Sequence, residues 1–301
     1  MRLSTNSIYQ SGINRIIEAQ AEQTKLQEKI ATGKEVISAA DDPVGATQAL
    51  KIAQNQQINA QFAANRTAAI NKLSDYESNL SSVTELFLQV KTSVIQAGNG
   101  TLKDSDRKNI AIQVSSAKEA LLALANAKDT NGYYVYSGFK TTTQTYDSAN
   151  DYKGSESFLN LQVDSNRTMQ IGVSGDDVFN ATYNMFDTLD NLVTALNTSA
   201  SDAAGKAALT ASLATANTEL QDGMDNVINQ RSKIGAYLNE LDMLNTSGSE
   251  TDFLYTKQLS AIQDLDYAQA ISDLSKNQTI LQAAQKTFVT TTGLSLFNYL
   301  N

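Results

Sequence analysis

The sequence feature that most constrains this chain is a long apolar stripe between a helix start signal and a helix stop signal. Asp41-Asp42-Pro43 is a start signal, because a carboxylate can accept from the free N–H groups of a first turn, where proline's missing donor is harmless. Gly98-Asn99-Gly100 is the next stop signal. Between them, apolar residues are spaced alternately by three and four, as in a coiled coil: Leu73, Tyr76, Leu80, Val83, Phe87, Val90, Val94 and Ala97. We therefore expect a helix from Pro43 to Ala97, about 80 Å long at 1.5 Å per residue.

Other stretches also show helical periodicity. One ends near Gly33, and another runs from about residue 104 to 128, before Asn131-Gly132. The pattern returns near residue 181, breaks at Ser247-Gly248-Ser249, and resumes in a last helix. Before that break, a row of apolar residues repeats every seven positions: Leu213, Leu220, Val227, Ile234 and Leu241. These lengths predict a mainly α protein, an elongated rod of long antiparallel coiled-coil-like helices with paired N- and C-termini.

A short central stretch, from residue 133 to about 180, has the period of two that is typical of strands. Two alternating apolar runs flank Asp164-Ser165-Asn166-Arg167, which is a hairpin turn signal. Tyrosine, threonine and glycine enrichment over 133–152 predicts further short strands. We therefore expect a small β module inserted in the helical chain.

Both ends of the chain are amphipathic helices whose apolar stripes are interrupted by glutamine. Such weak stripes cannot offset the entropy of ordering an isolated helix, so we expect these ends to be poorly ordered alone and to fold against partners. They could also pack into the bundle of their own chain. The expected assembly interface is Ile13, Ile16, Ile17, Leu26, Ile30, Tyr267, Ile271, Leu274, Leu281 and Phe288, with Asp41, Asp42 and Pro43 as the helix-entry turn.

The composition excludes several classes of chemistry. The chain has no Cys and no His, which removes zinc sites built on those residues, thiol nucleophiles and Ser-His-Asp triads. The net charge of −9 argues against binding to nucleic acid or to an anionic membrane. Near the N-terminus there is no apolar core of a secretory signal, so an extracellular role would need export without a cleaved signal peptide. We expect no cofactor and no metal.

Three small motifs remain as chemical candidates. Ser115-Ser116-Ala117-Lys118 has the spacing of a serine–lysine nucleophile, but a companion K-T-G element is missing. Asp147, Asn150 and Asp151 form the second motif and Asp176-Asp177 the third, and each could bind calcium, although solvated turns explain them better. Asp147, Asp151 or Asp176 could instead serve a secreted glycan hydrolase, for which an insert of roughly 45 residues leaves little room.

Several motifs spread over the chain resemble one family. Residues 29–34 (KIATGK) and 39–46 (AADDPVGA) resemble the amino-terminal signature of the flagellin superfamily. Residues 99–107, residues 131–141, and the C-terminal 281–284 (LQAA) and 294–297 (LSLF) are similar to its hook–filament junction branch. The resemblance covers nearly the whole chain and is specific in combination.

The resemblance implies a structural, non-enzymatic subunit of the bacterial flagellum. It implies a homo-oligomer in a helical lattice, with a hook-side junction protein (hook-associated protein 1) on one side and flagellin on the other. It also implies a flagellar export chaperone and an extracellular location at the hook–filament junction. The implied domains are terminal helices 1–40 with 260–301, a rod of 41–132 with 181–259, and an outer β-rich domain of 133–180. The alternative within the superfamily is flagellin itself, the filament subunit.

Overall fold

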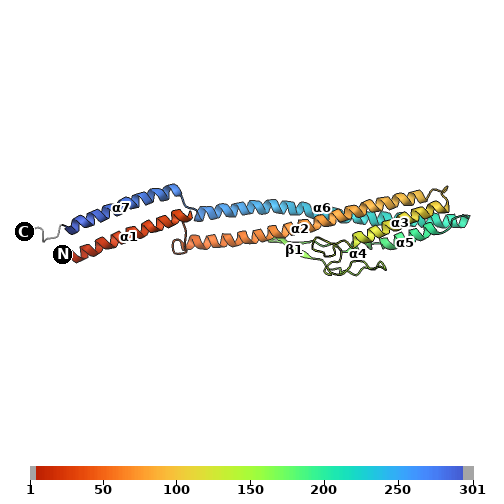
Figure 1. Cartoon of the computed structure of the whole chain (residues 1–301), viewed down its shortest axis with the longest axis horizontal. Helices are drawn as coiled ribbons and strands as arrows, with labels where there is room; N and C mark the ends of the chain where they lie inside the picture. Colours follow the sequence, from red (N-terminus) through yellow and green to blue (C-terminus); the bar gives the residue numbers. More distant parts are fainter. Residues whose placement is uncertain (1–4, 294–301) are drawn as a thin grey trace, which may run out of the picture. The chain divides into compact units, whose positions relative to one another are not determined.

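The computed structural model describes residues 5–293 and consists mainly of helices with one small hairpin (Figure 1). The chain divides into two compact units, here called unit 1 (residues 1–59 and 250–301) and unit 2 (residues 60–249). The elements are α1 (Thr5–Thr32), α2 (Pro43–Ala97), α3 (Asp104–Ala125), β1 (Asn160–Asp164), β2 (Arg167–Gln170), α4 (Gly175–Phe179), α5 (Met185–Asn197), α6 (Ala203–Gln263) and α7 (Tyr267–Gly293). The expected mainly α chain with a small β insert is confirmed.

Unit 2 is a helical bundle built from the apolar stripe. All eight stripe residues of α2 between Leu73 and Ala97 are at most 4% exposed, as are Leu220, Val227, Ile234 and Leu241 of α6. Side-chain contacts join the helices in turn: Asn79 of α2 donates to the Leu124 carbonyl of α3, and Lys118 of α3 pairs with Asp190 of α5 at 2.5 Å. Alternating three-and-four spacing thus predicted the core of unit 2.

Arg231 interrupts the apolar row of α6, and the structure shows how a charge is accommodated there. Its Nη2 lies 2.6 Å from Glu77 Oε1 on α2, and its Nη1 donates to the Thr84 hydroxyl at 3.3 Å. The guanidinium therefore crosses the α2–α6 seam at its edge, where it pairs with a carboxylate instead of displacing an apolar neighbour.

The β module contains one antiparallel hairpin, formed by β1 and β2 around the predicted turn, so that prediction is confirmed. Val163 and Met169 point into the core at 0% and 1% exposure. A buried arginine of α2 holds the hairpin: Arg66 Nη1 donates to the Val163 carbonyl at 3.0 Å, and its Nε donates to Asn245 Oδ1 of α6 at 2.6 Å. Burial lowers the pKa of Arg66 because desolvation disfavours its charge.

Residues 133–152 do not form the predicted short strands. Within the described residues this stretch has only isolated bridges, Lys128 with Tyr134 and Tyr146 with Tyr152. Aspartate side chains compete with a strand ladder by accepting from nearby N–H groups, as Asp147 does from Ala149 and Asp151. The tyrosines and neighbouring phenylalanines instead form an aromatic cluster: Tyr76, Tyr136, Tyr146, Tyr152, Phe179 and Phe186.

Two helix limits also differ from the sequence expectation. The helix after the β module begins at Met185, and α6 runs without a break through Ser247-Gly248-Ser249. A single glycine costs a helix only about 1 kcal/mol, and Ser249 Oγ is satisfied by the Asn245 carbonyl at 2.9 Å. The break before the last helix lies instead at residues 264–266, between the end of α6 and the start of α7. Unit 1 reaches residue 59 and resumes at residue 250, so it is larger than the predicted terminal domain of residues 1–40 with 260–301. The three-domain division stays a prediction.

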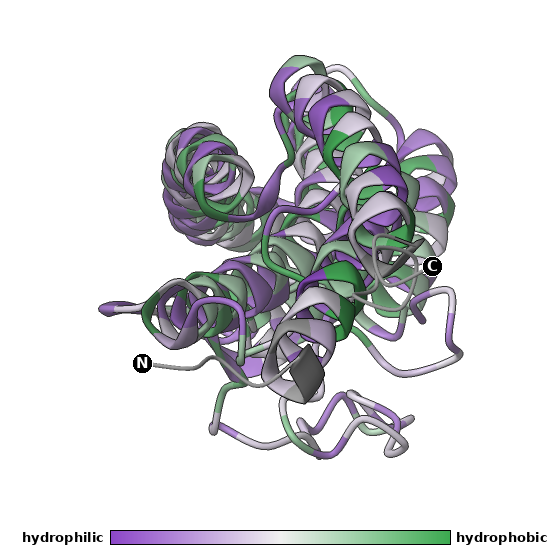
Figure 2. Ribbon diagram, turned by 90° about the vertical axis from the view of Figure 1, so that its left-hand side faces the viewer, coloured by the Kyte–Doolittle hydropathy of each residue, from purple (hydrophilic) through white to green (hydrophobic). Residues whose placement is uncertain are grey.

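Unit 1 has little core of its own. Among its described residues, only three apolar side chains are buried: Ala49, Leu265 and Ala270. Colouring by hydropathy shows hydrophobic and hydrophilic residues mixed along the helical ribbons (Figure 2). Among the described residues, no helix combines the length and the apolar character needed to span a bilayer.

Candidate assembly surface

The helix-entry turn between α1 and α2 uses its two aspartates differently. Asp42 caps α2 as predicted: its Oδ1 accepts from the backbone N of Val44 at 3.1 Å and of Gly45 at 2.9 Å. Asp41 instead ties the turn to α1, because its Oδ1 lies 2.8 Å from Lys25 Nζ and its Oδ2 accepts from the Ser38 N–H at 3.0 Å. The Lys25 hydrogen bond, followed by that from Ser38, holds the pKa of Asp41 well below its usual value.

A second turn, between α6 and α7, lies directly beside the first. The Glu35 N–H donates to the Gln263 carbonyl at 2.7 Å, and the Leu265 N–H donates to the Gly33 carbonyl at 3.0 Å. These bonds form a short antiparallel bridge, Lys34 with Asp264, between the two connections. Gly33 is suited to this place because its φ is +69° and a Cβ there would lie 2.7 Å from the Tyr267 hydroxyl.

Sequence reasoning missed the cap of α7. Asp266 Oδ1 accepts from the backbone N of Ala268 at 3.0 Å and of Gln269 at 3.1 Å. The signal was present as an aspartate directly before a helical stripe, the same signal that was recognised at Asp42. The apparent break at residues 247–249 drew the expected helix boundary away from it.

Helices α1 and α7 pack antiparallel along their half-buried stripes. The ring of Phe288 lies edge-on to that of Tyr9 with centroids 5.8 Å apart, and a Cβ on Gly12 would come within 2.7 Å of Phe288 Cδ2. Six of the ten predicted interface residues are half-buried: Ile16, Leu26, Ile30, Leu274, Leu281 and Phe288. The paired termini expected from the sequence are therefore present within one chain.

The other four predicted residues are exposed and form two pairs of one helical turn each. Ile13 and Ile17 of α1 are 41% and 58% exposed, and Tyr267 and Ile271 of α7 are 50% and 56% exposed. Residues four apart lie on the same helix face, so each pair makes a small apolar surface open to solvent. We call these four residues the outer pairs.

Further exposed apolar residues of unit 1 were not anticipated. They lie on the parts of α2, α6 and α7 that belong to unit 1 and comprise Val44, Leu50, Ile58, Phe253, Leu254, Ile280 and Val289. Their three-and-four spacing is weaker than that of the core stripe, so periodicity alone did not single them out. Large apolar groups left in water over a segment with almost no core are typical of a protein–protein surface.

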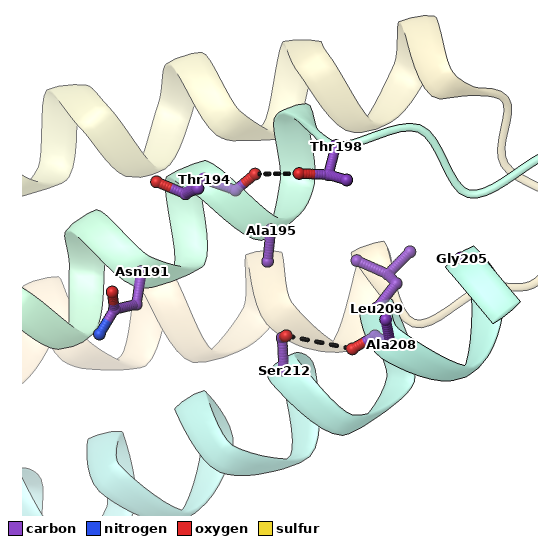
Figure 3. Close-up of a pocket in the computed structure, with 8 residues that line it drawn as sticks. All are labelled: Asn191, Thr194, Ala195, Thr198, Gly205, Ala208, Leu209 and Ser212. Atoms are coloured by element: carbon purple, nitrogen blue, oxygen red, sulfur yellow. Dashed lines mark hydrogen bonds between the residues drawn. The ribbon is translucent and has the colours of Figure 1, made fainter.

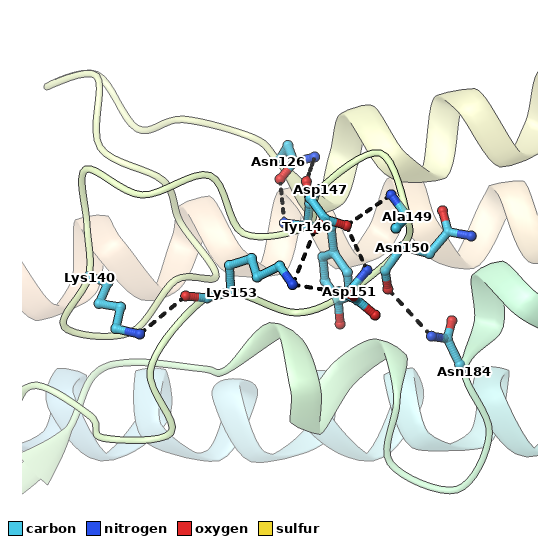
Figure 4. A network of polar contacts seen from close by, with 9 residues as sticks. All are labelled: Asn126, Lys140, Tyr146, Asp147, Ala149, Asn150, Asp151, Lys153 and Asn184. Carbon is cyan, nitrogen blue, oxygen red and sulfur yellow. Dashed lines mark hydrogen bonds and ion pairs between the residues drawn. The ribbon is translucent and has the colours of Figure 1, made fainter.

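The carboxylates of the β module are engaged in local structure (Figure 4). Lys153 Nζ lies 3.2 Å from Asp147 Oδ2 and 3.1 Å from Asp151 Oδ2. The pKa of Asp147 is lowered, mainly because its carboxylate accepts a hydrogen bond from the Asp151 N–H. Asp176 accepts from Asn180 Nδ2 at 2.9 Å. A general acid needs a raised pKa, so Asp147 is poorly suited to that role.

One cleft of unit 2 is lined without any titratable side chain. It lies between α5 and α6, has a volume of about 400 Å³, and is lined by alanine, threonine and serine together with Asn191, Gly205 and Leu209 (Figure 3). Two of its hydroxyls, Thr198 and Ser212, are bound to the carbonyls of Thr194 and Ala208 in their own helices. Over the part of the chain that the structure describes, no cluster of three or more metal-ligating side chains occurs. Lys118 of the serine–lysine motif is paired with Asp190.

Comparison with known proteins agrees with this arrangement of helices. The bacterial flagellin N-terminal helical region matches residues 3–141, and the bacterial flagellin C-terminal helical region matches residues 217–300. The motif at residues 294–297 lies outside the described residues and within the second match.

Individual relatives cover nearly the whole chain. Flagellar hook-associated protein 3 of Escherichia coli K12 is 37% identical over 99% of both chains. Flagellin of Bacillus subtilis 168 is 25% identical over 95% of this chain and 94% of its own. Among solved structures, hook-associated protein 3 of Legionella pneumophila has the same fold, with a TM-score of 0.66 and 18% identity over 70% of this chain and 98% of its own.

Proposed function

The chain belongs to the family of flagellar hook-associated protein 3, and on that premise we propose that unit 1 is the surface through which it assembles at the hook–filament junction. The family is one of structural flagellar proteins, so the chain is not an enzyme. Flagellin is the more distant relative. The observation that carries the proposal is the contrast within unit 1: three buried apolar side chains against eleven large exposed ones among its described residues.

The outer pairs are the part of this surface with the simplest role. Burying one isoleucine or tyrosine side chain against a neighbour contributes about 1.5–3 kcal/mol before the cost of association, so the four together can drive contact between subunits. The half-buried stripe residues hold α1 against α7, and Asp41, Asp42 and Pro43 set the turn into α2. In this proposal the ends of each subunit are incomplete until a neighbour covers them.

The proposed partners are the neighbours that a subunit would have within a continuous helical lattice. We propose further copies of this chain beside each subunit, a hook-side junction protein (hook-associated protein 1) below, and flagellin above. Within unit 1, the terminal assembly helices are residues 1–40 with 260–301. The ends of α2 and α6 that complete unit 1 extend the assembly surface into the rod, which is 41–132 with 181–259. The β-rich part of 133–180 faces outward. The absence of cysteine supports export as an unfolded chain with a dedicated chaperone, because no disulfide has to form or be reduced on the way.

A matched pair of substitutions tests the surface. Ile271→Glu places a charge in an outer pair, whereas Ile112→Glu makes the same change at an isoleucine of unit 2 that is 65% exposed. Cells producing the Ile271→Glu protein should carry hooks without filaments and release flagellin into the medium, as cells lacking the gene should. The Ile112→Glu protein should support filaments.

Circular dichroism must show equal helix content in the two variant proteins, because only then does the comparison concern the surface. Normal filaments with Ile271→Glu would contradict the proposed surface. Loss of filaments with both variants, each folded, would contradict the assignment of assembly to unit 1.

A further inference from the structure

The chain contains two Asn-Gly pairs, Asn99-Gly100 and Asn131-Gly132, and the structure treats them differently. Both pairs lie in exposed turns of unit 2. An asparagine followed by glycine is the chemical setting in which the next backbone nitrogen can attack the side-chain amide, because glycine has no Cβ to hinder the approach. The two sites have the same sequence chemistry and both are exposed, so we attribute a difference in their reactivity to the hydrogen bonds of the fold.

At Asn99 the side-chain amide is bound in a way that favours attack on its carbon. The Asn99 Oδ1 accepts from the Thr101 N–H at 3.1 Å and from the Thr101 hydroxyl at 2.8 Å. Both donors face the oxygen on which negative charge develops when a nucleophile adds to Cγ. They therefore lower the free energy of the tetrahedral intermediate relative to an amide that is only solvated.

The nucleophile at this site is also unhindered. Within the described residues, the structure shows no hydrogen bond from the Gly100 N–H, and the space around Gly100 is open, with nothing within 4 Å of where a Cβ would lie. The Asn99 carbonyl accepts from the Leu102 N–H at 3.1 Å, which draws electron density from the same peptide and makes its nitrogen easier to deprotonate.

At Asn131 the corresponding nitrogen is occupied. The Gly132 N–H donates to the Asp129 carbonyl at 2.9 Å, and Asp129 Oδ1 accepts from the backbone N of Asn131 and of Tyr133. The Gly132 nitrogen can reach the Asn131 side chain only if this turn opens. Opening costs at least one hydrogen bond, which lowers the rate by about five- to tenfold.

We infer that Asn99 is a site of spontaneous deamidation in the folded protein and that Asn131 is protected from it. The Gly100 nitrogen forms a bond to Cγ of Asn99 and gives its proton to the solvent. The side-chain nitrogen takes up a proton from the solvent, its bond to Cγ breaks, and it leaves as ammonia, so that the ring formed by the new bond becomes a succinimide. Water opens the ring at either carbonyl to give aspartate or isoaspartate.

The product changes the loop between α2 and α3 in charge and, for isoaspartate, in length. Each event adds one negative charge to a chain that already carries −9. Isoaspartate also adds one carbon to the backbone between Asn99 and Gly100. Because deamidation is irreversible without a repair enzyme, the fraction modified at this loop should increase with the age of the molecule.

The test follows both sites in the same sample of the full chain. The purified protein is kept in mildly alkaline buffer at body temperature, and peptide mapping by mass spectrometry measures the gain of about 1 Da at each asparagine over time. A parallel sample is kept in denaturant. We expect the rate at Asn99 to exceed that at Asn131 by about tenfold in the folded protein, and the two rates to be similar in denaturant. Similar rates in the folded protein, or a faster rate at Asn131, would overturn the inference.

Two variants separate the parts of the argument. Gly100→Ala should slow modification of Asn99 strongly while the fold stays intact, because the added methyl group enters open space. Thr101→Val removes one donor to Asn99 Oδ1 and should slow Asn99 several-fold without changing Asn131. Labelling by an isoaspartyl methyltransferase should detect isoaspartate at residue 99. Aspartate alone there would mean direct hydrolysis and would refute the succinimide route.

Discussion

The helices α2 and α6 each pass through two very different environments. In unit 2, residues 60–97 of α2 bury nine apolar side chains together with Ser93 and the charged Arg66, and α6 buries a heptad row from Leu213 to Leu241. In unit 1, residues 43–59 of α2 bury only Gly45 and Ala49, and residues 250–263 of α6 bury none. Each of these two continuous helices thus contributes to a buried apolar core in unit 2 and to a surface with few buried side chains in unit 1.

This contrast separates two sources of helical stability. Most of the stability of a protein helix comes from packing an apolar face, which unit 2 achieves within one chain. Unit 1 has capping aspartates, a bridge between its turns and a half-buried stripe, but eleven of its large apolar side chains are exposed. Its helices are therefore formed and paired within one chain, whereas the expectation from the sequence was that these ends would be poorly ordered alone.

The largest expected effect is a difference between core and surface truncation. Phe87→Ala removes a ring that is 1% exposed and should lower the free energy of unfolding by about 3–5 kcal/mol. Ile17→Ala, at a residue 58% exposed, should change it by no more than about 0.5 kcal/mol. Denaturant unfolding of the monomer measures both. Equal losses would mean that Ile17 is covered within its own chain.

A smaller effect should distinguish two glycines of α6 within unit 2. A Cβ at Gly223 would collide with Met185 of α5, whereas a Cβ at Gly235 would meet nothing within 4 Å. Gly235→Ala should therefore stabilise the protein by about 0.5–1 kcal/mol through helix propensity. Gly223→Ala should destabilise it by about 1–3 kcal/mol through overpacking. Thermal unfolding checks the signs, and stabilisation by both would show that the α5–α6 contact is loose.

The smallest effect concerns the acid range at the helix-entry turn of unit 1. Because the folded pKa of Asp41 lies below its unfolded value, its contribution to stability is complete above the ordinary aspartate pKa and is lost as the pH falls through the folded one. Lys25→Met removes the main cause and should raise the pKa of Asp41 toward its usual value. Carboxyl NMR titration measures this, with Asp147 of unit 2 as the unchanged reference. An unshifted Asp41 would show that Ser38 alone holds the carboxylate.

The sequence predicted best where one physical signal had no competitor. The limits of α2 agree residue for residue with the start at Pro43 and the stop after Ala97, because a cap and a glycine act locally. The failures were of two kinds. Ser247-Gly248-Ser249 resembles a loop, yet a helix of 61 residues continues through it. Tyrosine-rich residues 133–152 have strand composition, but their aspartates form turns and their rings join the core.

The candidate surface was only partly accessible to sequence reasoning. Periodicity identified Ile13, Ile16 and Ile17 as one stripe, but it could not show that Ile16 is half-buried while Ile13 and Ile17 are exposed. That division depends on which helix packs against α1, a contact more than 200 residues away in the sequence. The same limit applies to Asn99 and Asn131, whose motifs are identical and whose hydrogen bonds differ.

The antiparallel bridge between the two turns of unit 1 has a mechanical consequence. Glu35 and Leu265 link the connection that leads from α1 into α2 to the one that leads from α6 into α7. A force that displaces one terminal helix from its long helix therefore also acts on the connection of the other.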